Sequence, residues 1–477
     1  TQENRSQGAR FVTKITYQKS AATQIDIPPS EVISAPSISN SLGIGNDFFS
    51  LSGGDARLTL DNSKRQWDET YSGAYNRSRY NGEIRIWAGF TLSSGNNEYL
   101  NLYSGKITNI EMSGVAPYNA EITTSNQLVD EINKARIGAP STAGTPNPYI
   151  SGNLNRGRLT NLSAGTPNRY YYQYRGTINW DAYIPVVYKR RDGISDEYLP
   201  FAGSYNVSTN LKRVTFVEAT PGNLNYLSSV HKNFPTTNIP SVIRKILLNE
   251  LSIPSSHINA TSLNNVSNLQ IRLRQTPSST SYFVEFYDQG AREAIEKLCK
   301  ICYAAAFIEG YKFNMVSLGS PVSSGVSLTD KDYTRLSVTK DSNRIINKVK
   351  IFYNRFPLLP DIATKTNATS VASYGVRALK SLYSDFHYTY YDEIGQFSFN
   401  SASFFKGLAN TIVRTNAHEK KIFSLSGVFS KGIRLELGDK VRLTNKFFGL
   451  NQASAVVVGK EVDLNSKRTN LNLLGWP

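Results

Sequence analysis

Short segments in which apolar and polar residues alternate dominate the two ends of this chain. Residues 10–17, 55–60 and 83–90 each alternate in this way, and turn-forming residues follow them. A period of two places every second side chain on one face of a β-strand. Turn signals at intervals of roughly 10–15 residues are typical of antiparallel sandwiches and barrels. The pattern therefore predicts a meander of half-buried strands at the N-terminal end, and residues 336–477 predict a second region of the same kind.

Residues 284–318 carry the clearest helical pattern of the chain. From residue 291 onward, apolar residues recur at the spacing of one helix face. Glu293 and Lys297 form an i,i+4 pair of favourable order on the other face. Glu309-Gly310 then predicts a turn between two short strands. The stretch is expected to be an amphipathic helix packed on a two-stranded ribbon, which is a scaffold element and not a catalytic constellation.

The length of 477 residues is enough for about three domains. With 40% hydrophobic and 19% charged residues, such a chain can bury real cores. The predicted fold class is mainly β with a smaller α+β part, in which two antiparallel β-barrel-like domains flank an inserted helix-plus-ribbon domain. The predicted boundaries are 1–136 for the first β-domain, 137–232 for an irregular arm, 233–335 for the insertion and 336–477 for the second β-domain.

Two stretches are expected to lack regular structure. Pro28, Pro29 and Pro36, with the Ser/Asn-rich sequence up to residue 46, predict loops. The 137–232 arm is rich in Gly, Pro, Asn and Tyr, and long irregular segments in compact proteins usually serve a contact. Within the arm, one tyrosine cluster is a candidate interface anchor, with an ordinary aromatic strand as an equal alternative. The cluster consists of Tyr170, Tyr171, Tyr172 and Tyr174.

The chain is basic, with a formal net charge of +16 and a pI of about 9.5. Such a charge allows an acidic partner, although a basic surface spread thinly over a large protein is the favoured interpretation. The densest basic run, Lys189, Arg190 and Arg191, is a candidate contact for passing DNA. It does not lie on a recognisable nucleic-acid-binding module.

Motifs that would carry catalysis or a metal are missing from the sequence. Cys299 and Cys302 have C-x-x-C spacing but lie inside the predicted helix, so they are interpreted as buried packing groups. His418-Glu419 begins an H-E-x-x-H motif that lacks its second histidine, because residue 422 is Ile. The sequence therefore predicts no enzyme, no cofactor and no metal site. The longest apolar run, residues 301–308, is too short to span a membrane.

One acidic and aromatic cluster supports an alternative function. Two carboxylates on a tyrosine-rich strand pair are a minimal arrangement for glycoside hydrolysis. Exposed hairpins often carry such residues without a function, so the ordinary surface remains favoured. The alternative is a carbohydrate-binding adhesin or depolymerase. The cluster contains Asp385, His387, Tyr388, Tyr390, Tyr391, Asp392 and Glu393.

Several stretches in order resemble the tail hub proteins of long-tailed phages and related injection particles. The stretches cover roughly three quarters of the chain, while the arm departs from the family pattern. They are ARLTLDNSKRQW (56–67), EIRIWAGF (83–90), LYSGKITNIE (102–111), the helix at 240–251 with IPSSHINATSL (253–263), residues 284–318, residues 327–354, LELGDKVRLTN (435–445) and residues 456–476.

The resemblance implies a structural protein of the virion that works by assembly. Hubs of this family are trimers whose paired β-barrel domains join a six-fold tail tube to a three-fold tip. The implied partners are further copies of the chain, the distal tail or tail tube protein, the tape-measure protein, and tail fibres or spikes. DNA would pass transiently through the central channel, with no stable membrane insertion. The implied location is the tail tip, after assembly in the cytoplasm of the bacterial host.

Overall fold

The computed structural model describes most of the chain outside residues 138–238, where it describes the backbone of short strands. The described residues are 10–20, 23–42, 51, 56–67, 82–92, 94–113, 115–116, 118–137, 239–273, 282–286, 289–319, 321–353, 361–382, 386–388, 401–428 and 430–476, together with the strands between residues 149 and 229.

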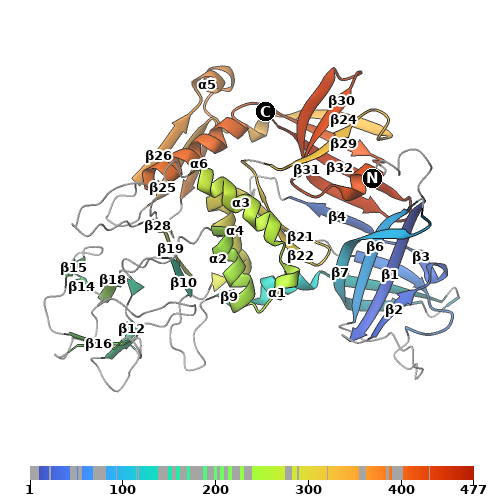
Figure 1. Ribbon diagram of the computed structural model, residues 1–477, viewed down its shortest axis with the longest axis horizontal. Coiled ribbons are helices and arrows are strands. Elements are labelled where there is room, and N and C mark those ends of the chain that lie inside the picture. Colours follow the sequence, from blue (N-terminus) through green and yellow to red (C-terminus); the bar gives the residue numbers. More distant parts are fainter. Residues whose placement is uncertain are drawn as a thin grey trace.

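The protein is mainly β, as predicted, and two seven-stranded sheets dominate it (Figure 1). The first sheet has the strand order β2-β1-β6-β7-β8-β5-β3. Its strands are β1 (Phe11–Ser20), β2 (Thr23–Ile27), β3 (Val32–Ser34), β5 (Ala56–Asp61), β6 (Glu83–Thr91), β7 (Asn97–Met112) and β8 (Asn119–Ser125). The second sheet has the order β23-β30-β31-β32-β29-β24, with β4 paired to β31. Its strands are β4 (Ser37–Ser41), β23 (Ser323–Leu328), β24 (Arg335–Asp341), β29 (Lys420–Ser426), β30 (Lys440–Asn445), β31 (Leu450–Asp463) and β32 (Arg468–Gly475).

Alternation produces the first sheet as expected. In β6 the side chains of Ile84, Ile86 and Ala88 are fully buried, while the residues between them are partly exposed. Their core is built mostly from one face of the same sheet, and Trp67, in the turn after β5, packs edge to face on Tyr17 with the ring centres 5.6 Å apart. A sheet that buries its own face in this way must curl over it, which the right-handed twist of strands favours.

The expectation of barrels is wrong for the strands that the structure describes. The first sheet ends at β2 and β3, and no pairing joins these two edge strands. The second sheet likewise ends at β23 and β24. Alternation fixes which face of a strand is buried, but it does not determine whether the first and last strands meet. Both sheets are therefore open.

The strand β4 corrects the prediction of a loop before residue 46. Residues Ser37–Ser41 pair antiparallel with β31, from Ser41 opposite Gly459 to Ser37 opposite Asp463. Ile38 is buried in the core of the first sheet, although its strand belongs to the second. A segment from the N-terminal part of the sequence thus joins the C-terminal sheet and connects the two.

The helices and the ribbon form a third body beside the two sheets (Figure 1). The predicted helix and ribbon of residues 284–318 are confirmed as α4 (Ala291–Cys302), β21 (Ala304–Glu309) and β22 (Lys312–Ser317). Their apolar residues share one core with the other helices. These are α1 (Gln127–Lys134), α2 (Ile239–Lys245) with its π-helical continuation Ile246–Glu250, α3 (Ala260–Leu273) and α6 (Ser401–Asn416).

The remaining elements are short. A three-stranded sheet of β26-β25-β27 packs against α6. Between residues 149 and 229, short strands form two four-stranded sheets, ordered β11-β18-β14-β15 and β12-β13-β17-β16. The bounds are β9 (Arg136–Ile137), β10 (Tyr149–Gly152), β11 (Gly157–Arg158), β12 (Thr160–Asn161), β13 (Arg169–Tyr171), β14 (Val186–Arg190), β15 (Tyr198–Pro200), β16 (Tyr205–Ser208), β17 (Arg213–Phe216), β18 (Tyr226–Ser229), β19 (Tyr282–Phe286), β20 (Gln289–Gly290), β25 (Lys348–Tyr353), β26 (Asp361–Thr366), α5 (Ala368–Tyr374), β27 (Ala378–Leu382), β28 (Phe386–Tyr388) and α7 (Ser430–Arg434).

Candidate functional site

The turn between β21 and β22 is the point where the ribbon meets both large sheets. Gly310 forms a bridge with Tyr103 of β7, in the first sheet. Its backbone has a φ of +61°, and a Cβ at this position would lie 3.0 Å from the carbonyl oxygen of Asn101. The turn is therefore restricted to glycine by both its conformation and its neighbour. The residue before it, Glu309, contacts the second sheet.

A buried ion pair makes that second contact. Lys460 of β31 donates to Glu309 Oε1 at 2.9 Å and to the carbonyl oxygen of Ile433 at 3.0 Å. The two charged side chains are only 3% and 12% exposed. Pairing and hydrogen bonding offset the cost of removing both charges from water, so the pair specifies how the ribbon sits on the second sheet.

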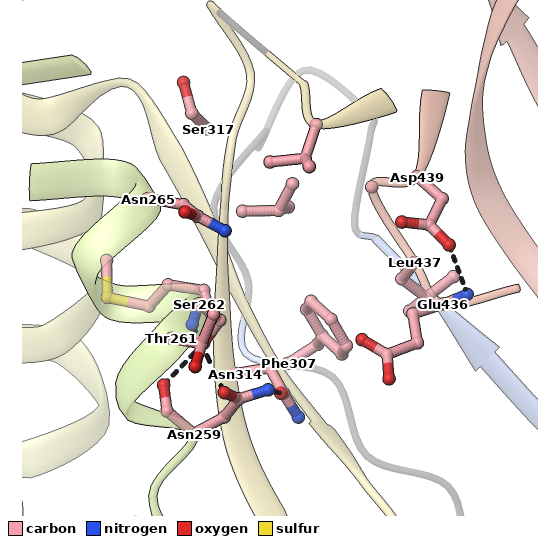
Figure 2. A pocket seen from close by; sticks show the side chains of 14 residues that line it. Asn259, Thr261, Ser262, Asn265, Phe307, Asn314, Ser317, Glu436, Leu437 and Asp439 are labelled. Atoms are coloured by element: carbon pink, nitrogen blue, oxygen red, sulfur yellow. Dashed lines mark hydrogen bonds between the residues drawn. The ribbon is translucent and has the colours of Figure 1, made fainter. Parts of the chain in front are cut away.

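Next to this ion pair, a pocket of about 190 Å³ opens between the ribbon and the second sheet (Figure 2). Gly438, in the turn before β30, packs so closely on β22 that a Cβ there would clash with the side chain of Val316. The polar lining residues include Asn259, Ser262, Asn314, Glu436 and Asp439, and the apolar ones include Phe307, Met315, Val316, Val322 and Leu437.

The amide wall of the pocket is held by its own hydrogen bonds. Asn259 precedes α3, donates from Nδ2 to Asn314 Oδ1 at 2.8 Å and accepts from the backbone N–H of Ser262 at 3.2 Å. Ser262 Oγ in turn accepts from the backbone N–H of Met315 at 3.1 Å. These bonds cap the helix and attach it to β22, so the wall is a rigid surface.

The opposite wall is acidic. Burial raises the pKa of Glu436, and the negative charge of Glu309 raises it further. Burial also raises the pKa of Asp439, although the hydrogen bond from the backbone N–H of Glu436, at 3.0 Å, opposes that rise. The two carboxyl groups and Glu309 thus repel one another on this wall, and the positive charge of Lys460 offsets part of that repulsion.

The geometry of the pocket suits binding. Ligand pockets for small molecules usually have volumes of roughly 300–1,000 Å³, so this pocket is closer in size to one large side chain.

Within the part of the chain that the structure describes, no cluster of three or more His, Cys, Asp or Glu residues is arranged to hold a metal ion. A search of the same residues finds no helix that is both long and apolar enough to cross a membrane.

The candidate residues of the arm are only partly within the described structure. Tyr170 and Tyr171 lie on β13, while Tyr172 and Tyr174 fall outside the described residues. Lys189 and Arg190 lie on β14, which belongs to the other four-stranded sheet, and Arg191 falls outside the described residues. The interface and DNA-contact roles of these residues stay predictions.

The proposed sugar-binding cluster also lies only partly within the described residues. His387 and Tyr388 lie on β28, which pairs with β19. The carboxylate-bearing residues Asp385, Asp392 and Glu393 fall outside the described residues, as do Tyr390 and Tyr391. The carbohydrate-binding alternative stays a prediction.

The two cysteines are packing groups, as predicted. Cys299 and Cys302 are buried free thiols on α4. Burial raises the pKa of Cys299 well above its usual range and that of Cys302 to about 12. Since the thiolate is the reactive form, both thiols are held in their inert form at neutral pH.

Sequence reasoning did not identify the pocket. Its carboxylates, Glu436 and Asp439, lie on either side of Gly438, but the facing residues Asn259 and Phe307 are far away in the sequence. Gly438 is a local signal for a turn, but a turn residue does not indicate which distant residues will face it.

Neither a protein-family model nor a curated protein matches the chain. Among solved structures, the 43 kDa tail protein of prophage MuSo2 from Shewanella oneidensis aligns with 97% of this chain and 98% of its own, at 10% identity and a TM-score of 0.46. A prophage tail protein from Listeria monocytogenes aligns with 97% of this chain and 94% of its own, at 8% identity and a TM-score of 0.46. A chain of the phage P2 baseplate in its activated conformation aligns with 97% of this chain and 99% of its own, at 8% identity and a TM-score of 0.32.

At these identities, no residue role passes from those proteins to this chain. Each of these solved structures aligns with nearly the whole length of this chain.

Proposed function

We propose that this protein is a structural component of a phage or prophage tail, acting as a hub at the distal end of the tail. In this role it joins the tail tube to the tip or fibres and lines the channel for tape-measure protein and DNA. Its partners are further copies of itself in a homotrimer, the distal tail or tube protein, the tape-measure protein, and fibres or spikes.

The order of elements along the chain carries this proposal. The stretches that resemble the tail hub family occur as strands of the first sheet, then the helices and ribbon, then strands of the second sheet. The ribbon turn and β4 join these three bodies through Gly310, the Lys460–Glu309 pair and the β4–β31 ladder. Because these contacts join the three bodies into one scaffold, the structure supports a role in assembly, in which a protein must transmit force between its neighbours.

Immunogold labelling of purified tails or tail-like particles tests the proposal. Antibodies against the chain are expected to label one end of each particle, the end that carries the tip. A particle population that lacks the chain, or labelling spread along the length of the tube, contradicts the hub position. Particles assembled without the gene serve as the control for antibody specificity.

A further inference from the structure

A pair of exposed aromatic residues stands at the hairpin between β30 and β31. Phe447 is 89% exposed and Phe448 is 39% exposed, and their rings meet edge to face at 5.0 Å. Exposed aromatics that cluster on a protein surface usually mark a contact with another molecule. We call Lys446, Phe447 and Phe448 the aromatic tip.

The base of the aromatic tip is fixed to the core of the second sheet. The backbone N–H of Phe448 donates to Asn445 Oδ1 at 3.1 Å, and Asn445 Nδ2 donates to the hydroxyl of Tyr333 at 2.8 Å. Both Asn445 and Tyr333 are buried. The backbone of the tip is therefore anchored at Phe448, which lowers the entropy that the turn loses when it binds.

The pocket beside the ribbon offers a complementary surface. Phe307, Met315 and Leu437 supply apolar walls, and Val322 leaves 48% of its surface uncovered at the pocket. The carboxyl groups of Glu436 and Asp439 lie at the second-sheet side of the same pocket (Figure 2). An aromatic ring that enters with a cation beside it would fit both properties, and Phe447 with Lys446 is such a combination.

The tip cannot reach the pocket of its own chain. Asp439 lines the pocket directly before β30, and the tip directly follows the end of β30. A strand of six residues spans roughly 20 Å at about 3.3–3.4 Å per residue. The tip and the pocket thus lie at opposite ends of one strand, and only a tip from another copy can enter the pocket.

We propose that the aromatic tip of one copy of this chain inserts into the pocket of a second copy, with Lys446 against Glu436. The contact is head to tail, since each copy uses a different surface for each neighbour, and such contacts generate closed rings or filaments. This inference deepens the proposed function and rests on it in one respect, namely that a tail hub assembles with copies of itself.

Sedimentation velocity of the full chain over a wide concentration range tests the contact. The wild-type chain is expected to self-associate, and Phe447→Ser should weaken that association at least tenfold. Lys446→Glu and Glu436→Lys should each weaken it, because each places like charges together. The double variant Lys446→Glu/Glu436→Lys restores the opposite charges and should recover association. Lys467→Glu, in the exposed turn at the other end of β31, is the matched control and should change nothing.

Three outcomes overturn the inference. If Phe447→Ser associates as the wild type does, copies meet through another surface, and the hub proposal stands without this contact. If the double variant is no stronger than the single variants, Lys446 and Glu436 do not meet. A wild-type chain that stays monomeric at every concentration also removes the contact, while immunogold labelling decides the hub position separately. Thermal unfolding of each variant confirms that the exposed substitutions leave the fold intact.

Discussion

The two large sheets bury their inner faces in different ways. The first sheet encloses a core supplied mostly by its own strands and by Trp67, to which the second sheet and its turns add Ile38, Ile433, Val462 and Leu464. The second sheet takes Ala305, Phe307 and Val316 from the ribbon, and Leu42 from the end of β4, into its core. The core of the first sheet is thus completed by the second sheet, whereas the core of the second sheet is completed mainly by the ribbon.

This difference explains where the pocket lies. A core completed by a separate ribbon has a boundary where the two bodies meet, and the pocket opens at that boundary. The second sheet also carries the aromatic tip. The core completed by the ribbon and both proposed contact surfaces therefore belong to the same part of the molecule.

Lys460→Met, which tests how the ribbon is held on the second sheet, is expected to cause the largest loss of stability. It leaves the carboxylate of Glu309 buried without its partner, and breaking a buried pair in this way costs about 3–5 kcal/mol. Chemical denaturation measures the loss, and hydrogen exchange should show it first in β21, β22 and β31. The double variant Lys460→Met/Glu309→Leu removes both charges and should recover most of the stability. An unrecovered double variant would show that packing, and not the orphaned charge, causes the loss.

Ile38→Ala tests whether β4 truly connects the two sheets. Truncation of a buried Ile costs about 2–5 kcal/mol through lost burial and a cavity. Because Ile38 lies in the core of the first sheet and on a strand of the second, amide exchange should increase in both β5 and β31. Increased exchange confined to one sheet would contradict the connection. Ile33→Ala, at a side chain that is 53% exposed on β3, is the matched control.

Lys420 gives the second sheet a pH-dependent weakness. Burial lowers the pKa of this lysine to about 8, and its ammonium lies 5.3 Å from the ring centre of Trp476. Below pH 8 the folded chain must hold a charged, buried amine, and this cost disappears as pH rises from 8 towards the ordinary lysine pKa near 10.4. The cation–π contact recovers part of the cost.

Lys420→Met should therefore stabilise the protein at pH 7, by on the order of 1–3 kcal/mol. The difference from the wild type should shrink between pH 8 and pH 10.5. Denaturant midpoints across this range measure it, with the exposed neighbour Lys421→Met as the control. A constant difference at every pH would mean that the amine is not the cause.

Asn259→Ala gives the smallest expected effect. Loss of the side chain that caps α3 costs about 1 kcal/mol and also frees Asn314 on the pocket wall. The free energy of unfolding should fall slightly, while the free energy of association through the pocket should fall by a larger amount. Asn126→Ala removes the cap of α1, a helix that does not line the pocket. It should lower the free energy of unfolding by a similar amount without affecting association.

Much of the fold was visible in the sequence, and the reason is local. In β6 and in α4 the apolar spacing is set by each element's own buried face, so a short window contains the whole signal. In Ser37–Ser41 only Ile38 is apolar, and the partner that makes the segment a strand is β31, at the other end of the chain. Whether a sheet closes, and where the pocket forms, also depend on contacts between residues that are far apart in the sequence. A local pattern contains no information about such contacts.

The aromatic tip shows a signal that could have been used. Phe447-Phe448 followed by Gly449 interrupts the alternation between two strands. Two neighbouring strand residues point to opposite faces, so adjacent aromatics before a glycine indicate a turn with exposed rings. The sequence could indicate the exposure, but its fixed base required Asn445 to meet Tyr333, 112 residues away.

The placement of β4 also sets an order of events during synthesis. Residues 37–41 leave the ribosome about 400 residues before Gly459, with which Ser41 pairs. At translation rates of roughly 5–20 residues per second, β4 waits about 20–80 s for its partner strand. Over that interval the strands of the first sheet can pair with one another while β4 still lacks its partner strand. Nascent chains are therefore most exposed to mispairing with one another at this strand until the last residues of β31 emerge.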